Sequence, residues 1–276
     1  MKTKIIAAAL LLSGFGAWVW TACDKIPEDE TRTSTELPEW QGKTVVLEDF
    51  TGVGCTNCPN AAEIAHNLQT LMGDKLIVVE LHGQTAQISE SLVAPQAAGD
   101  PDLRNAAAAV YSTHWKVAGL PVGLINRKQD EGISRARWRG TAIGVYGEVP
   151  VATIEATASL SGSTISVSAN GLFPQAYSGE IHVLTMILED GFSVTQIVNG
   201  EETPGYIHNH VLRHVIDNPW GVKIMDGVSA DSTRFEYAGT VNVEPNWKKE
   251  NLSVAVLLCN NGTKEILNAA KVELNQ

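Results

Sequence analysis

The residues that decide the fold are 44–83, TVVLEDFTGVGCTNCPNAAEIAHNLQTLMGDKLIVVELHG. Two short apolar runs rich in β-branched residues, 44–50 and 76–81, flank a stretch at 59–72 whose apolar residues recur at helical spacing. Short continuous apolar runs are typical of strands buried on both faces of a parallel sheet. This part of the chain therefore predicts a strand, a helix and a second, parallel strand.

The α/β pattern continues for about seventy residues more. A polar, alanine-rich stretch at 84–109 predicts one or two helices, LPVGLINR at 120–127 predicts a third strand, and 133–147 predicts a closing helix. We therefore expect an α/β domain over 43–147.

Beyond Glu148 the apolar residues alternate with a period of two. The alternation on both sides of 161–163 predicts a hairpin, and further short strands follow at regular spacing to the end of the chain. About seven short strands in this length are typical of an antiparallel sandwich. We expect an all-β domain over 148–276 with immunoglobulin-like architecture.

The N-terminus has the pattern of an export signal. Two lysines precede an apolar run that ends in WTAC, residues 20–23. This ending resembles a bacterial lipobox, where the signal is cut before a cysteine that becomes lipidated. We therefore expect a signal peptide at 1–22, a lipid anchor at Cys23 and, from its acidic and threonine-rich composition, a flexible tether over 23–42. An ordinary cleaved signal that leaves Cys23 free is the alternative.

Composition and charge exclude several classes of protein. The chain has 276 residues and a formal net charge of −11, and it contains no run of Lys and Arg interleaved with aromatic residues. Nucleic acid is therefore not an expected partner. No phosphate loop, dinucleotide fingerprint or G-x-S-x-G motif occurs, so we predict no cofactor and no hydrolase activity.

The candidate reactive group is the C-x-x-C pair, Cys55 and Cys58, placed where the first strand passes into the helix. The unpaired N–H groups at a helix N-terminus stabilise a thiolate, which makes Cys55 the predicted nucleophile. Cys58 would attack the mixed disulfide that Cys55 forms with a partner. Cys259 closes an apolar run and is predicted to be a buried strand residue.

The segment LEDFTGVGCTNCP resembles the active-site segment of the thioredoxin superfamily, and VAGLPVGLI resembles its cis-proline loop. The resemblance implies a thioredoxin-like fold over 43–147, a cis-proline at Pro121, and a buried proton-relay carboxylate at Asp49, six residues before Cys55. The sequence departs from that family at Gly54, where a tryptophan is usual.

The whole chain resembles a narrower group, the twenty-eight-kilodalton outer-membrane protein family of Bacteroidetes-type bacteria. The lipobox, the acidic tether, LEDFTGVGCTNCP, LPVGLINR and YIHNHVLRHV occur in the order that this family shows. The resemblance implies an outer-membrane lipoprotein that faces the periplasm or the cell surface. Its expected partners are exported or surface proteins, as thiol–disulfide substrates or as binding partners, and the membrane through the lipid anchor.

Alternatives to a redox pair stay open. An exported disulfide can be purely structural, which would leave an anchored binding or adhesion protein. Zinc at Cys55 and Cys58 is disfavoured, because no second C-x-x-C or closely spaced histidine pair supplies further ligands, and we predict no metal. His208, His210 and His214 would share one face if they lay on a single strand, and we interpret that face as partly buried rather than metal-binding.

Overall fold

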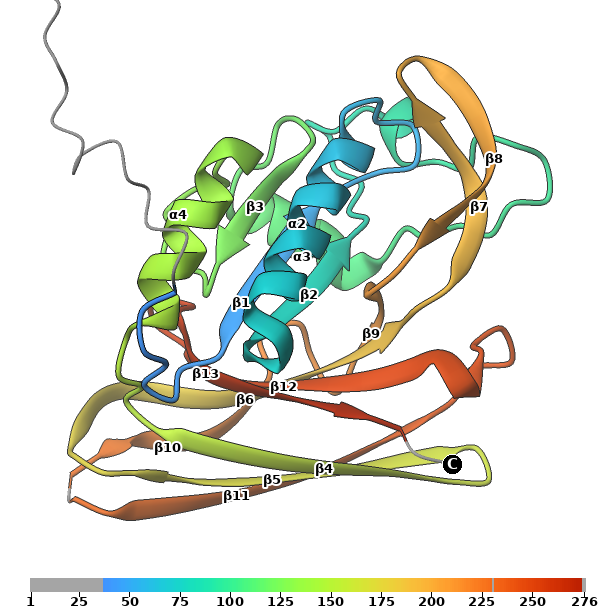
Figure 1. The fold of residues 1–276 in the computed structure, drawn as a ribbon. Coiled ribbons are helices and arrows are strands. Elements are labelled where there is room, and N and C mark those ends of the chain that lie inside the picture. Colours follow the sequence, from blue (N-terminus) through green and yellow to red (C-terminus); the bar gives the residue numbers. More distant parts are fainter. Residues whose placement is uncertain (1–36, 230, 275–276) are drawn as a thin grey trace, which may run out of the picture. The chain divides into compact units, whose positions relative to one another are not determined.

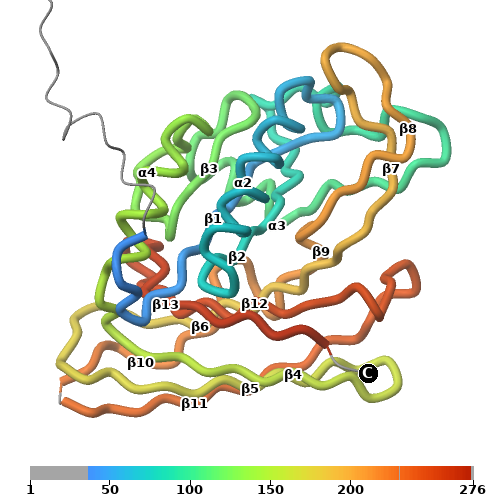
Figure 2. The backbone as a smooth tube through the Cα atoms, in the orientation of Figure 1, coloured from blue at the N-terminus to red at the C-terminus, as the bar shows by residue number. Residues whose placement is uncertain are grey.

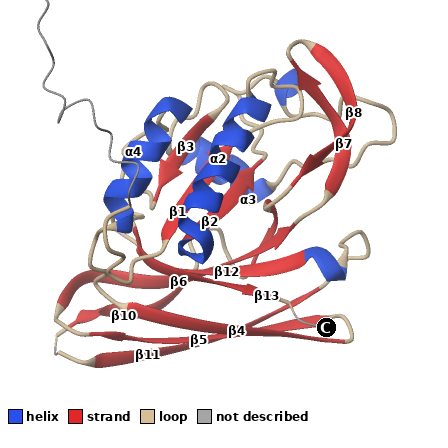
Figure 3. Ribbon diagram, viewed as in Figure 1, coloured by secondary structure: helices blue, strands red, loops and turns tan. Residues whose placement is uncertain are grey.

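The structure is a computed structural model that describes residues 37–229 and 231–274. The residues from Leu37 onward form one compact unit. The predicted signal peptide, the lipid anchor at Cys23 and most of the predicted tether lie outside the described residues. The fold is rich in β-strands, and its α-helices gather around the first three strands (Figure 3).

The predicted strand, helix and strand form as the sequence pattern indicates. β1 (Val45–Phe50) and β2 (Leu76–Leu81) are buried along their whole length and pair in parallel, with Asp49 opposite Glu80. Between them α2 (Cys58–Met72) begins with a proline in its first turn and ends at Gly73, whose φ is +60°. The other elements of this part are α3 (Ala106–His114), β3 (Val122–Ile125), α4 (Arg135–Tyr146) and the short 3₁₀ turns Gly73–Lys75 and Glu90–Leu92.

The rest of the chain is almost entirely β. The predicted hairpin forms, since β4 (Thr153–Ser161) and β5 (Thr164–Phe173) pair antiparallel on the two sides of the turn at Gly162. The strands are β4 (Thr153–Ser161), β5 (Thr164–Phe173), β6 (Tyr177–Glu189), β7 (Phe192–Val198), β8 (Glu201–His208), β9 (Val211–Val215), β10 (Val222–Val228), β11 (Thr233–Asn242), β12 (Leu252–Asn260) and β13 (Ile266–Glu273), with a 3₁₀ turn at Lys249–Asn251.

One sheet runs through both predicted domains. Its order is β13-β12-β6-β9-β2-β1-β3, with β10 also paired to β6 (Figure 1). The join between the two parts is short, because β9 pairs with β2 only through Val211 and Glu80. The strands β11, β5 and β4 form a separate sheet, and β7 and β8 form a two-stranded ribbon.

The sheets and helices stack in layers. On one face of β1, β2 and β3 lie α2 and α4, with Leu68 and Trp138 in the shared core. On the other face lies α3, whose core continues onto one side of β6 and β12. The opposite side of β6 and β12 packs against the three-stranded sheet, through residues such as Val183, Val256 and Phe173. The β part is therefore two facing sheets, as Figure 2 shows along the backbone.

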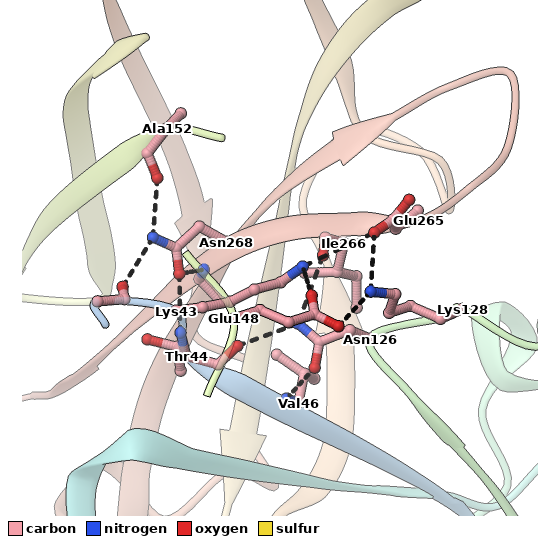
Figure 4. A network of polar contacts seen from close by, with 12 residues as sticks. Lys43, Thr44, Val46, Asn126, Lys128, Glu148, Ala152, Glu265, Ile266 and Asn268 are labelled. Carbon is pink, nitrogen blue, oxygen red and sulfur yellow. Dashed lines mark hydrogen bonds and ion pairs between the residues drawn. The ribbon is translucent and has the colours of Figure 1, made fainter. Parts of the chain in front are cut away.

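Two buried asparagines join segments that are far apart in the sequence (Figure 4). Asn126, after β3, accepts a hydrogen bond from Val46 N (2.8 Å) and donates to Thr44 O (3.0 Å). Asn268, in β13, accepts from Thr44 N (2.9 Å) and donates to Ala152 O (2.9 Å). Because buried amides are costly to leave unpaired, these contacts fix the start of β1 against β13 and the approach to β4.

Candidate functional site

Cys55 and Cys58 form a disulfide in the structure, with 5.4 Å between their Cα atoms. Cys58 is the first residue of α2, and its backbone N–H donates to Cys55 O (3.1 Å). The pair is enclosed, because Cys55 is only 3% exposed and Cys58 2%. The helix-terminus placement agrees with the sequence prediction, whereas the burial could not be read from the local motif.

The ribbon β7–β8 covers the pair from one side. Ile197 N donates to Val53 O (2.9 Å), and Gly200 N donates to Thr56 Oγ1 (2.8 Å). The side chain of Gln196 donates to Cys55 O (3.0 Å) and is itself fully buried. A segment about 140 residues away in sequence therefore holds the backbone at Val53 and Cys55 and the side chain of Thr56.

A second cover comes from the segment between β2 and α3. Gly54 N donates to Leu92 O (2.9 Å), and a Cβ added to Gly54 would lie only 2.0 Å from Ser91 O. No side chain fits at that position. The contact explains why glycine precedes Cys55, because any larger residue would push the covering backbone away.

Asp49 lies buried on the face of the sheet that α2 covers. It shares that face with Leu47 and Val45 by the alternation of strand residues, and it is 0% exposed. Neither carboxylate oxygen has a hydrogen-bond partner among the described residues. Burial, and then the neighbouring charge of Glu80, raise the pKa of Asp49 well above its usual value.

The peptide bond between Leu120 and Pro121 is cis, the isomer that the resemblance implies. Pro121 is buried, and the Leu120 side chain packs on the loop before the disulfide, 3.1 Å from where a Cβ on Gly52 would lie. The loop before β3 therefore lies against the segment that carries the pair.

A chain of buried polar side chains runs from the disulfide into the sheet. Gln196 Oε1 accepts a hydrogen bond from His208 Nε2 (3.1 Å), and His208 Nδ1 lies 2.9 Å from Glu80 Oε2. The same oxygen of Glu80 also lies 3.5 Å from His82 Nε2. Burial opposes ionisation of Glu80, but the charge and hydrogen bond of His208 outweigh it and lower the pKa of Glu80 to about 2.

The sequence prediction missed this chain of side chains. The spacing of Glu80 and His82 in VVELHG places both on one face of a strand, so their proximity could have been predicted from the sequence. The partners His208 and Gln196 come from the ribbon, and no local pattern connects them with residue 80.

The expectation that His208, His210 and His214 share one strand face is wrong. β8 ends at His208 and β9 begins at Val211, and between them His210 has a positive φ of 59°. His208 is buried against Glu80, whereas His210 Nε2 faces Gln69 Oε1 (3.1 Å) and His214 is exposed. The chain turns at His210, between His208 and His214, so the three histidines do not form one cluster.

A groove lies between α2 and the end of β8. Its volume is 250 Å³, and Glu80 forms part of its floor. The wall residues are Pro59, Ala62, Glu63, Ala65, His66, Gln69, Val78, Tyr206, Ile207, Asn209 and His210. The buried polar chain is therefore reached from the surface beside the first turns of α2.

The remaining described cysteine is not part of this site. Cys259 lies in β12, free and buried, as predicted. Burial raises the pKa of its thiol to about 12. It therefore stays protonated at neutral pH and is a weak nucleophile.

Fold and site together define a β-rich protein with an α/β part that carries an enclosed C-x-x-C disulfide. The family model of Outer membrane protein Omp28 matches residues 108–276, and the chain belongs to that family. The match covers the cis-proline loop and all strands from β3 onward but not the cysteine pair. No helix in the described part of the chain is long and apolar enough to cross a membrane.

Solved structures give further likenesses. HBP35 of Porphyromonas gingivalis matches with a TM-score of 0.64 at 15% identity, over 86% of this chain and 76% of that one. Protein AGR_C_4864 from Agrobacterium tumefaciens matches with a TM-score of 0.51 at 16% identity, over 84% and 95%. A domain of the outer membrane lipoprotein Omp28 from P. gingivalis matches at 0.33 and 19% identity, over 46% and 91%. No curated protein matches the chain.

Proposed function

We propose that the protein is a thiol–disulfide exchange protein of the cell envelope, with a thioredoxin-like α/β part that carries Cys55 and Cys58. The observation that carries the proposal is the disulfide at the N-terminus of α2 together with the buried, unpartnered carboxyl of Asp49. An unpartnered buried carboxyl destabilises the fold, and such costs are typical of functional sites.

The reaction follows from the order of the groups. In the reduced protein the Cys55 thiolate attacks a sulfur of a partner disulfide, which forms a mixed disulfide and releases one partner thiolate. Cys58 then loses its proton to Asp49 and attacks the Cys55 sulfur. This step releases the second partner thiol, so the partner gains two electrons and the pair becomes the disulfide. The reverse sequence donates a disulfide.

Access to the pair requires the ribbon β7–β8 to move. Its contacts with Val53, Cys55 and Thr56 leave the sulfurs enclosed. Exchange therefore proceeds from an opened form, and partners that displace the ribbon are favoured substrates.

The proposed location is the outer membrane, through a lipid on Cys23 and the tether at 23–42. The family to which the chain belongs carries the name of an outer membrane protein, which supports this location. Exported or surface proteins are the partners that this position offers.

The test is reduction of a model protein disulfide by the full-length protein with a thiol reductant present. Replacing Cys55 with serine should abolish turnover. Cys259→Ser is the matched control, because this cysteine is buried and far from deprotonation at neutral pH, and it should leave turnover unchanged. Equal turnover in the Cys55→Ser variant would remove the proposal.

Enclosure of both sulfurs favours a second candidate, an anchored binding protein in which the disulfide only fixes the loop before α2. Under this proposal the Cys55→Ser, Cys58→Ser double variant keeps its binding partners from the envelope, and no turnover is seen with the unchanged protein.

A further inference from the structure

We propose that Glu80, His82 and His208 form a binding site for one divalent transition-metal ion of the zinc class. Two imidazoles and one carboxylate are a donor set that such ions accept, with a fourth position left for water or another ligand. The site is distinct from the cysteine pair and does not depend on the proposed exchange activity.

The fold brings the three side chains together from two places. Glu80 and His82 lie two residues apart at the end of β2, so they point to the same face. His208 is the last residue of β8. Their ligand atoms all lie within 4.8 Å of one another, and the three residues are only 7%, 1% and 3% exposed.

The hydrogen bonds of Gln196 orient His208 for a metal ion. The amide nitrogen of Gln196 faces three backbone carbonyls, those of Gly52 (3.4 Å), Cys55 (3.0 Å) and Ile197 (3.1 Å). Its oxygen is therefore an acceptor, and His208 Nε2 must donate to it (3.1 Å). The lone pair of a neutral His208 is then on Nδ1, 2.9 Å from Glu80 Oε2.

A bare imidazole nitrogen and a carboxylate oxygen repel each other unless a cation or a proton lies between them. Among the described residues, the ion-pair partners of Glu80 are His82 and His208, and neither Lys nor Arg reaches it. A metal ion here would take the place of the proton on His208 Nδ1 and would contact all three groups at once. The Gln196 contact then becomes the outer hydrogen bond that ligating histidines usually make.

Unpartnered polar groups next to the site point to a ligand as well. His82 Nδ1 is buried without a hydrogen-bond partner among the described residues, and so are both oxygens of Asp49. Asp49 is the register partner of Glu80 on the neighbouring strand, and therefore lies on the same face. In its ionised form Asp49 adds a second negative charge beside the site, which increases the attraction of the site for a cation.

The groove beside α2 gives the ion a route to this site. Glu80 lies on the floor of this 250 Å³ groove, and Glu63 and His66 lie along its wall. A cation that enters this groove therefore approaches the site through Glu80, the one of the three residues that lines it.

The test uses the full-length protein, stripped of metal with a chelator and carrying Cys55→Ser and Cys58→Ser so that the thiols of the C-x-x-C pair cannot bind the ion. Zn²⁺ is titrated by calorimetry and Co²⁺ by visible absorption. We expect one ion per chain and a cobalt spectrum from nitrogen and oxygen ligands. His82→Ala and His208→Ala should weaken binding at least tenfold, and Gln196→Ala about tenfold to a hundredfold.

The matched control is His214→Ala, which removes an exposed histidine outside the site and should leave binding unchanged. Where His208→Ala fails to fold, Glu80→Gln keeps the shape of the site and removes its charge, and it should still lose the Zn²⁺-dependent rise in melting temperature. The proposal would be overturned if no ion bound at one per chain, or if the Glu80→Gln and His82→Ala variants bound Zn²⁺ as tightly as the protein that keeps these residues. Glu80 and His208 would then be only a hydrogen-bonded ion pair.

Discussion

Glu48 and Asp49 are neighbours on β1 with opposite environments. Glu48 points to the α3 face and forms a buried ion pair with Arg127 (2.6 Å), whose guanidinium stacks 4.6 Å from the ring centre of Tyr111. Asp49 points to the α2 face and has no hydrogen-bond partner in the described part of the chain. The same residue class therefore stabilises one face of the strand and destabilises the other.

Asp49→Asn should stabilise the protein at neutral pH, by about 1–3 kcal/mol, because the amide does not ionise and so avoids the free-energy cost of a carboxyl whose pKa is raised on folding. The folded-state pKa of Asp49 is raised above its unfolded value, so its stabilising protonated form is fully present only below that unfolded value of 3.8. As pH rises above it, the unfolded state ionises first and stability is lost. Urea unfolding from pH 4 to pH 8 should show a growing advantage of the variant, and a constant difference would contradict this account.

Glu48→Gln should have the opposite effect. It leaves the buried guanidinium of Arg127 without its counter-charge, and breaking such a pair costs about 3–5 kcal/mol. Denaturant unfolding at pH 7 measures the loss. Glu201→Gln, at an exposed position of β8, is the control and should change stability by no more than about 0.5 kcal/mol.

At the scale of elements, local patterns predicted most of the α/β part correctly. The runs at 44–50 and 76–81 become β1 and β2, and the helical spacing at 59–72 becomes α2. The ribbon β7–β8 could be predicted only as strands, because its position over Cys55 depends on contacts between residues far apart in sequence. The contact between His208 and Glu80 could not be predicted for the same reason, because the two residues are 128 positions apart in the sequence.

Gln196→Ala should loosen the ribbon over the disulfide. The variant loses the hydrogen bond to Cys55 O, and a loss of about 1.4 kcal/mol raises the population of the opened form about tenfold. The rate of disulfide reduction by dithiothreitol in native buffer with chelator should rise accordingly. Glu202→Ala, exposed on β8, is the control, and equal rates in both variants would show that the ribbon does not limit access.

At the scale of the whole molecule, the spacing of apolar residues changes near residue 148, where the chain passes from the α/β part to the β part. The main sheet nevertheless continues through both parts. The sequence pattern predicts separate α/β and all-β domains over 43–147 and 148–276. Pairing of β9 with β2, and of β6 with β9, joins their strands into one sheet, and such pairings cannot be read from periodicity.

Because the sheet and the buried asparagines connect both parts, the described part of the chain should unfold in one transition. Trp138 lies in the core under α4 and Trp247 in the core between the facing sheets. Each variant, Trp138→Phe and Trp247→Phe, is unfolded in denaturant and followed by tryptophan fluorescence and by circular dichroism. Within each variant the two methods should give the same midpoint. Two separated midpoints would instead support independent domains.

The central claim is that Cys55 and Cys58 form a working redox pair, and its reduction potential tests this most directly. The full-length protein is equilibrated with defined dithiothreitol or glutathione ratios, and the thiols are trapped and counted. The account predicts a potential near or above about −270 mV, within the range of exchange proteins of this kind. A value well below about −300 mV would mark a structural disulfide and contradict it.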